Sequence, residues 1–436
     1  MEKHPWPLFL SAPLLGICQS VLLVYTPIFL AKTSLPLATL ALLMSFGSAL
    51  FLFSTPMWAK TSLRWGYRRV LMTGVFGLTS SFSLLYLAVW GTSQQQWSLL
   101  WVTLVVLVAR LIYGMMASAI VPTCQAWITE HNDVKLDAKN TLNKLAELST
   151  VMAIGRLLAP LLALLLIWID WRSPLLFLVF FPLTCLLCIA KFTTSHRKYT
   201  EEQGVKSAPL AADTNVDNAH ETALMAEGSR LNSKLRSSLL LSITLICISH
   251  STVIYLLTPM ALQWLALDDE SASQFLSLLM TLAALAMVLC HGFSSRIKIV
   301  NHFNMMLLAN AMLVLSLASM LLASGYILLI AIPLLSGAFA ILQLQITSLM
   351  CNLADKSRKA IATGLVAKFQ TLGYVFGAGL LWLTHSDIES TLLVLCVLAL
   401  AQVTSLFSWQ YQIQQANKHP LITANEFKPQ DRSSNI

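Results

Sequence analysis

Charged residues are scarce in this chain. Asp, Glu, Lys and Arg together make up 11% of its 436 residues, whereas an average soluble domain has about 25%. Hydrophobic residues make up 56%, and they recur in stretches of about 20, the length that crosses a bilayer as a helix. An open sheet would leave backbone groups unsatisfied in lipid, so we expect these stretches to be helices. The composition excludes a soluble protein and predicts an all-α membrane protein.

Acidic side chains and metal-ligand patterns are almost missing from the apolar stretches. Glu147 is the one acidic residue within a predicted span, since every other Asp and Glu falls in a hydrophilic segment. The eight cysteines are scattered through the spans, and the pair Cys185 and Cys188 has no second pair of ligands nearby. No Ser/His/Asp or His/Glu/His pattern is present. We therefore expect no disulfide, no metal, no cofactor and no enzymatic activity.

The apolar stretches predict twelve spans when the chain is read in windows of about 19 residues. We place them near residues 8–31, 35–58, 70–91, 97–122, 145–168, 174–192, 237–264, 272–292, 303–323, 326–350, 360–384 and 391–411. One long hydrophilic segment, rich in Ala, Asn, Asp, Glu, Ser and Thr, separates the sixth span from the seventh. The sequence thus predicts a six-helix half (1–192), a disordered cytoplasmic linker (193–236), a second six-helix half (237–411) and a cytoplasmic tail (412–436).

The basic residues are distributed unevenly along this plan. Most of the 28 Lys and Arg residues fall on the side that holds the termini and the linker, and only Lys32 and Arg172 fall on the opposite side. By the positive-inside rule, both termini and the linker are cytoplasmic. This asymmetry explains the net charge of +8 without a nucleic-acid partner. We expect a monomeric multi-pass protein of a cell membrane, namely a bacterial inner membrane.

The two halves resemble each other in sequence. Residues 18–27 of the first span contain a polar cluster, a tyrosine and then Thr-Pro. Residues 249–259 of the seventh span repeat this order. Two related halves with a substrate site at their interface are the plan of a secondary transporter.

Three cations lie within the spans, against the single carboxylate of Glu147. They are Arg110, Arg156 and Lys368. An arginine at mid-bilayer costs about 2.5 to 3.5 kcal/mol on insertion scales, so such residues usually face a protein interior or a water-filled path. The surplus of positive charge, which internal pairing does not absorb, predicts a cavity that handles an anion.

Each embedded residue also has a purely structural explanation, which the sequence leaves open. Arg110 would bond carbonyls freed at helix breaks, and Lys368 would extend its ammonium to the cytoplasmic surface. His250 would be a satisfied core histidine. Its ordinary pKa near neutrality also makes it, with Glu147, a candidate to carry the coupling proton.

Helical geometry groups the candidate residues by face. At 100° per residue, Glu147 and Arg156 lie on opposite faces of one helix, so they are not a local ion pair. Arg110 shares its face with Tyr113 and Gly114, where a neighbouring backbone or a ligand would approach closely. The predicted substrate-binding residues are Arg110, Arg156, Lys368, Gln19, His250, Tyr113 and Gln370.

Three short motifs resemble those of the major facilitator superfamily, in particular its twelve-helix proton-driven exporters. The fourth span contains Arg110-Leu-Ile-Tyr-Gly114, which is similar to the family's Arg-x-x-x-Gly motif. The fifth contains Gly155-Arg156-Leu-Leu-Ala159-Pro160, which is similar to the exporters' Gly-x-x-x-Gly-Pro motif, with alanine at its second glycine. The resemblance implies the two-half fold and a transport activity.

The loop after the second span is similar to a third motif of the family. It reads Arg64-Trp-Gly66-Tyr-Arg68-Arg69, but Leu63 stands where the family has aspartate. The family's charge contact between helices is therefore not expected in its usual form. The resemblance assigns a conformational role to Arg64, Gly66, Arg68, Gly114, Gly155 and Pro160.

These observations favour export of an anionic, carboxylate-bearing small molecule, driven by proton antiport. Among family members with the exporter motif, carriers of carboxylate siderophores fit a cation-rich cavity best, because guanidinium and carboxylate pair in a bidentate way. A multidrug exporter is one alternative, although an exporter of lipophilic cations typically holds an acid that spans one, two and four lack. An importer of a carboxylate or sugar-like metabolite is the other.

Overall fold

The computed structural model describes residues 10–130, 138–192, 219–296, 302–322, 325–352, 359–384 and 387–418. Within these ranges the chain forms helices joined by short turns, and it contains no strand. Eleven of the described helices are long and apolar enough to cross a membrane. In the helix at the predicted fifth span, the apolar part, Ile154–Ile169, is shorter. The structure thus agrees with the predicted all-α membrane protein.

Seven α-helices and one short 3-10 helix have both ends within the described residues of the first half. They are α2 (Leu14–Thr33), α3 (Leu37–Trp65), α4 (Tyr67–Gln95), α5 (Leu99–Met116), η1 (Ala117–Ala119), α6 (Ile120–Glu130), α7 (Ala138–Ile169) and α8 (Ser173–Phe192).

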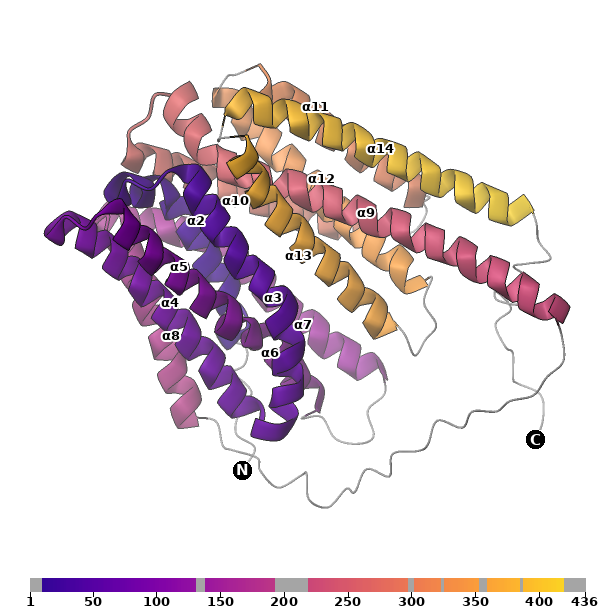
Figure 1. The fold of residues 1–436 in the computed structure, drawn as a ribbon, viewed down its shortest axis with the longest axis horizontal. Helices are drawn as coiled ribbons and strands as arrows, with labels where there is room; N and C mark the ends of the chain where they lie inside the picture. Colours follow the sequence, from indigo (N-terminus) through magenta and orange to yellow (C-terminus); the bar gives the residue numbers. More distant parts are fainter. Residues whose placement is uncertain are drawn as a thin grey trace.

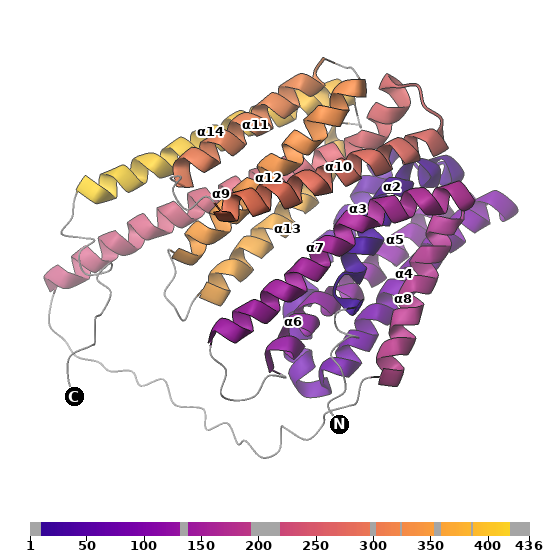
Figure 2. The ribbon, with the colours of Figure 1, turned by 180° about the vertical axis from the view of Figure 1, so that it is seen from behind.

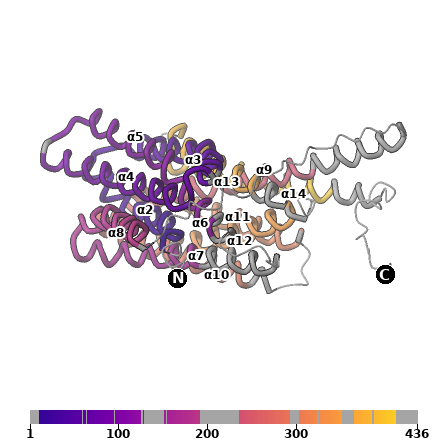
Figure 3. Tube along the Cα trace, turned by 90° about the horizontal axis from the view of Figure 1, so that it is seen from below, coloured from indigo at the N-terminus to yellow at the C-terminus, as the bar shows by residue number. Residues whose placement is uncertain are grey.

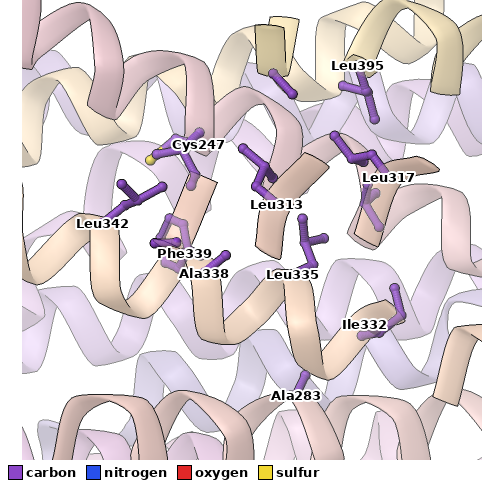
Figure 4. Packing of buried hydrophobic residues seen from close by; sticks show 14 of the residues in the cluster. Cys247, Ala283, Leu313, Leu317, Ile332, Leu335, Ala338, Phe339, Leu342 and Leu395 are labelled. Atoms are coloured by element: carbon purple, nitrogen blue, oxygen red, sulfur yellow. The ribbon is translucent and has the colours of Figure 1, made fainter. Parts of the chain in front are cut away.

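The second half forms six α-helices and a second 3-10 helix. They are α9 (Ala219–Trp264), α10 (Asp269–Arg296), α11 (His302–Met320), η2 (Gly325–Ile327), α12 (Leu328–Asn352), α13 (Lys359–Leu383) and α14 (Ile388–Lys418). Their buried side chains form a large apolar cluster, to which α9, α10, α11, α12 and α14 contribute the residues labelled in Figure 4. A second large cluster joins the helices of the first half.

Two predicted boundaries differ from the structure. Helix α9 begins at Ala219 and so includes residues 219–236, which the sequence assigns to the linker. These residues are polar, but Ala, Leu, Met, Glu, Lys and Arg among them favour a helix, and an existing helix extends without a new nucleation step. Similarly, α14 continues to Lys418, into the predicted tail.

The predicted fourth span is not one continuous helix. It is divided by η1, three small residues after α5, and α6 then continues the path. Pro122 lies in the first turn of α6. It has no N–H to donate, and in a continuous helix its ring would clash with the carbonyl of the residue four positions earlier. The hydroxyl of Ser118 donates to the carbonyl of Met115 across the break (3.1 Å). The break thus follows from proline, as helix distortions usually do.

The two halves lie side by side, and they meet where α3 packs on α13 and where α7 and α2 pack on α10. Figure 1 shows α3 beside α13, and Figure 2 shows α7 beside α10, in agreement with the contacts of these helices. The end of the structure at which α2 begins and α8 ends is called the linker end below, and the opposite end is the far end.

Equivalent serines join the halves at both helix pairs. Ser45, eight residues into α3, donates to the carbonyl of Val375 in α13 (3.3 Å). Ser277, eight residues into α10, donates to the carbonyl of Pro160 in α7 (2.6 Å). Both helices begin at the far end, so both hydrogen bonds hold the halves together in the part of the molecule near that end.

Removing these hydroxyls is expected to favour separation of the halves at the far end. An interhelical hydrogen bond in a membrane contributes about 0.6 kcal/mol, a factor of about three in an equilibrium constant. Ser277→Ala should have the larger effect, because Ser45 also donates within its own helix to Ala41 (3.0 Å). The measurement is the distance distribution between spin labels at Gln96 and Glu389, in a cysteine-free background.

Ser48→Ala is the matched control, because Ser48 donates to Met44 of its own helix. The control should leave the distances unchanged. If Ser45→Ala/Ser277→Ala gives the same distribution as the control, the two bonds do not set the separation of the halves.

Candidate functional site

Polar and aromatic residues from both halves gather at mid-height in the structure. Each of them is counted from the end of its own helix that lies at the far end of the molecule. By this count the residues lie 9 positions (Tyr374) to 14 positions (Gln19) into their helices. At 1.5 Å per residue this is about 14 to 21 Å, the middle of a bilayer core. We call the following residues the central cluster: Gln19, Arg110, Tyr113, Arg156, His250, Tyr255, Phe339 and Tyr374.

Arg110 is the most deeply buried charge of the central cluster. Its side chain is 3% exposed, and its Nε and Nη2 atoms have no hydrogen-bond partner among the described residues. The guanidinium lies 5.3 Å from the centre of the Tyr113 ring, a cation–π distance. Because burial of an unpaired charge is costly, this arrangement favours any anion that reaches the two free N–H groups.

Tyr113 is held in place from the neighbouring helix. The amide Nε2 of Gln19 in α2 donates to the Tyr113 hydroxyl in α5 (2.6 Å), and Gln19 itself is exposed. The phenol is thereby fixed beside the Arg110 guanidinium. A polar path therefore leads from an exposed amide to the buried charge.

Arg156 also lies against helix α2. A Cβ atom added to Gly16 would come within 2.8 Å of Arg156 Cγ, so the arginine stem lies directly over that glycine. Gly16 is one turn from Gln19 on the same face of α2. This face of α2 therefore contacts Arg156 at Gly16 and, through Gln19, the tyrosine beside Arg110.

Arg156 is exposed, yet it does not face lipid. The lipid-facing stripe of α7 consists of the exposed residues Ile154, Leu158, Leu161 and Leu165. At 100° per residue, Arg156 lies on the opposite face, toward the second half. The predicted orientation into the protein agrees with this placement.

The second half contributes phenols and aromatic rings to the cluster. Tyr255 of α9 lies within electrostatic range of Arg110, and Tyr374 of α13 lies within electrostatic range of Arg156. The ring of Phe339 in α12 stacks on His250 (4.3 Å), and Tyr374 meets the same histidine edge-on (6.4 Å). Cations of the first half therefore lie near tyrosine side chains of the second half.

Other predicted residues differ in how close they lie to this cluster. Gln370 shares the face of Tyr374 on α13, about 40° away, whereas the exposed Lys368 lies about 120° from it. His250 is buried, and its Nδ1 atom has no partner among the described residues. Glu147 lies in helix α7, outside the residues whose side chains are described. Its coupling role stays a prediction.

The glycines of the predicted motifs occupy positions where a side chain would not fit. A Cβ on Gly114 would lie 2.5 Å from the carbonyl oxygen of Gly47 in α3, and one on Gly155 would lie 2.6 Å from Pro13. Gly114 thus allows α3 to approach α5 closely, and Gly155 allows the beginning of α2 to approach α7 closely. Gly66, between α3 and α4, is needed instead for its backbone, because its φ of 81° disfavours other residues.

The arginines of the third motif behave differently from each other. Arg64 is exposed at the linker end of α3. Arg68 donates through Nη2 to the carbonyl of Ala190 at the end of α8 (2.5 Å). The motif therefore ties α4 to α8 within the first half. Pro160, from the exporter-like motif, accepts the hydrogen bond of Ser277 described above.

Three members of the cluster are not among the substrate-binding residues predicted from the sequence. Tyr255, which lies near Arg110, is one of them. Phe339 and Tyr374 were not singled out. The only sequence signal for Tyr374 is its position beside Gly373, where α13 packs closely on Cys247 of α9.

Long apolar helices in two adjoining halves, with charged and polar residues at mid-height between them, define a polytopic transport protein. The family model of the Major Facilitator Superfamily matches residues 8–378. The chain belongs to that superfamily, whose members are transporters rather than enzymes. No curated protein matches the chain by sequence.

Solved structures of other transporters share this fold at low sequence identity. A bacterial homologue of the human lysosomal transporter Spinster, in an inward-facing and unoccupied conformation, matches with 14% identity and a TM-score of 0.69, over 94% of this chain and 97% of its own. The nucleoside transporter NupG matches with 12% identity and a TM-score of 0.63, over 95% and 99%. The human organic anion transporter MFSD10 (TETRAN) matches with 18% identity and a TM-score of 0.58, over 93% and 99%.

The close approach at Gly114 makes Gly114→Ala a destabilising substitution. The new methyl group would meet the Gly47 backbone, which does not move aside, and overpacking of this kind costs about 1 to 3 kcal/mol. The purified protein should unfold at a lower temperature. Transport should also fall, because Arg110, which lies one helical turn from Gly114, would be displaced.

Gly379→Ala is the matched control, since a methyl group there meets nothing within 4 Å. That variant should unfold at the wild-type temperature or slightly above it. Equal stability of the two variants would show that α3 and α5 do not depend on the glycine for their packing.

Proposed function

We propose that this chain exports an anionic, carboxylate-bearing small molecule by secondary active transport. The observation that carries the proposal is Arg110, which is buried at mid-height with two guanidinium N–H groups unpartnered among the described residues. A guanidinium stays charged at physiological pH and presents its N–H groups in a planar fork that fits a carboxylate.

The rest of the central cluster supports a substrate with more than one acidic group. Arg156 supplies a second cation on the interior face of α7, and Tyr255 and Tyr374 supply hydroxyl donors opposite the two arginines. A polycarboxylate between them would touch both halves at once. A carboxylate siderophore is the substrate class that best fits this charge and spacing of donors.

Contact with both halves explains how binding would be linked to movement. A ligand shifts a conformational equilibrium only if it binds the two states with different affinity. In the present arrangement the hydrogen bonds of Ser45 and Ser277 join the halves near the far end. Substrate would enter from the linker end, draw the halves together around the cluster, and leave after the far-end contacts separate.

We assign the coupling ion as a proton, exchanged for substrate through Glu147 or His250. His250 has one ring nitrogen without a partner among the described residues, and it lies beside Tyr374 in the cluster. With the termini in the cytoplasm of a bacterial cell and the chain acting as a monomer, proton entry would drive export. The exporter-like motif at Gly155 favours this direction over import.

Replacing either arginine with lysine should reduce transport despite the retained charge. The ammonium of lysine lacks the fork, and loss of a charged hydrogen bond costs about 1.5 to 3 kcal/mol, a factor of about 10 to 150 in affinity. Arg110→Lys and Arg156→Lys should therefore raise the concentration of a labelled citrate-type siderophore needed for half-maximal uptake into inside-out vesicles. Arg69→Lys, at an exposed position, is the control and should behave as wild type.

Competition experiments separate the proposal from the multidrug alternative. Polycarboxylates should compete with the labelled siderophore, whereas cationic dyes and neutral drugs should not. Strong competition by cations alone would return the chain to the multidrug exporters. Uptake only into right-side-out vesicles, under an inward proton gradient, would instead identify an importer.

Loss of the coupling group should uncouple transport without abolishing it. Glu147→Gln and His250→Gln are tested separately, and the variant that removes the proton carrier should still exchange substrate downhill but no longer respond to a pH gradient. The measurement is siderophore flux in proteoliposomes with and without the gradient. Gradient-driven flux in the double variant would show that neither residue carries the proton.

A further inference from the structure

A second basic site lies at the far end of the first half, away from the central cluster. The ammonium of Lys32, in the last turn of α2, is 4.7 Å from the centre of the Trp171 ring. The guanidinium of Arg172 is 4.9 Å from the same ring. The two residues that the charge pattern places on the far side are thus brought to one indole, although 140 positions separate them in the sequence.

A shallow pocket lies beside this indole, between α4 and α8. Its walls include Tyr86, Trp90, Ser93, Trp171, Arg172 and Leu175. The pocket is on the flank of the first half that faces away from the second, as Figure 3 shows for α4 and α8. It is therefore separate from the interface in which we place substrate.

Apolar residues continue from the pocket toward the middle of the bilayer. On α8, Leu176 and Phe180 follow Arg172 at intervals of four residues, so the three share one face, and both apolar residues are exposed. On α4, Leu87 and Trp90 are exposed. The surface thus has basic and aromatic residues at headgroup level and an apolar strip nearer the middle of the bilayer. The headgroup and the acyl chains of a phospholipid follow in the same order.

The charge balance narrows the choice of headgroup. Lys32 and Arg172 both lie against the Trp171 ring, so an anion that reaches this indole is attracted by two positive charges. The carboxylate of Asp170 lies close by and accepts a hydrogen bond from the backbone N–H of Arg172 (2.8 Å). Two cations and one carboxylate leave about one positive charge, which matches the single charge of a phosphodiester rather than a polycarboxylate.

We propose that this Trp171 pocket binds a phospholipid with an anionic headgroup from the leaflet at the far end. The phosphodiester lies between Lys32 and Arg172, and an acyl chain runs along Leu176 and Phe180. The site is independent of the transported substrate. It would fix the loop between α7 and α8 to the membrane surface.

The test is lipid binding by the purified full-length protein, followed by native mass spectrometry with phosphatidylglycerol and phosphatidylcholine of equal chain length. Wild type should bind phosphatidylglycerol at least tenfold more tightly. Each cation near an anionic surface contributes a factor of about five, so Lys32→Gln/Arg172→Gln should weaken binding of that lipid about 25-fold. Lys32→Arg/Arg172→Lys keeps both charges and should stay within about threefold of wild type.

Lys60→Gln removes an exposed cation near the linker end of α3 and is the control for net charge; it should bind phosphatidylglycerol as wild type does. Equal affinity for the two lipids, or the same loss in the control as in Lys32→Gln/Arg172→Gln, would overturn the proposal. Glycerophosphoglycerol, the phosphodiester headgroup without acyl chains, is added as a competitor. Displacement of the lipid at equal concentration would identify a site for free anions instead, and would equally overturn it.

Discussion

The structure depends on the cost of holding a permanent positive charge at the centre of a membrane. Arg110 is surrounded by features that make its position tolerable: the face of the Tyr113 ring, the amide that fixes this ring, and the close approach of α3 at Gly114 that excludes lipid. None of these neutralises the charge. A charge held in this way is available to an anion, and the low dielectric would strengthen their attraction.

The two halves contribute different chemistry to the place where they meet. The first supplies guanidinium groups, while the second supplies phenols and a histidine packed on an aromatic ring. A substrate bound by both halves would lose part of its partners whenever the halves separate. Serine hydroxyls bonded to backbone carbonyls at equivalent positions of α3 and α10 show that the inter-half contacts follow the same twofold plan as the sequence repeat.

The sequence predicts the helices well because span length and hydrophobicity are properties of a single segment, and the face of Arg156 follows from the helical period alone. It does not reveal that α9 begins at Ala219, because hydrophobicity says nothing about a helix that continues outside the bilayer. The partners Tyr255, Phe339 and Tyr374 were also missed as members of the site. Each of them meets the cluster through packing between helices that are distant in sequence, which no local pattern records.

The length of α9 has a mechanical consequence. At 1.5 Å per residue, its 46 residues extend about 69 Å, more than twice the thickness of a bilayer core, and Figure 1 shows it reaching past the linker ends of α12 and α13. Such a helix acts as a lever arm. If the second half rotates by about 10° around a pivot near the far end, the tip of α9 sweeps about 12 Å through the space beyond the membrane. The same rotation would move the central cluster, about 14 to 21 Å from that pivot, by only about 2 to 4 Å, so the tip of α9 would move several times farther than the cluster.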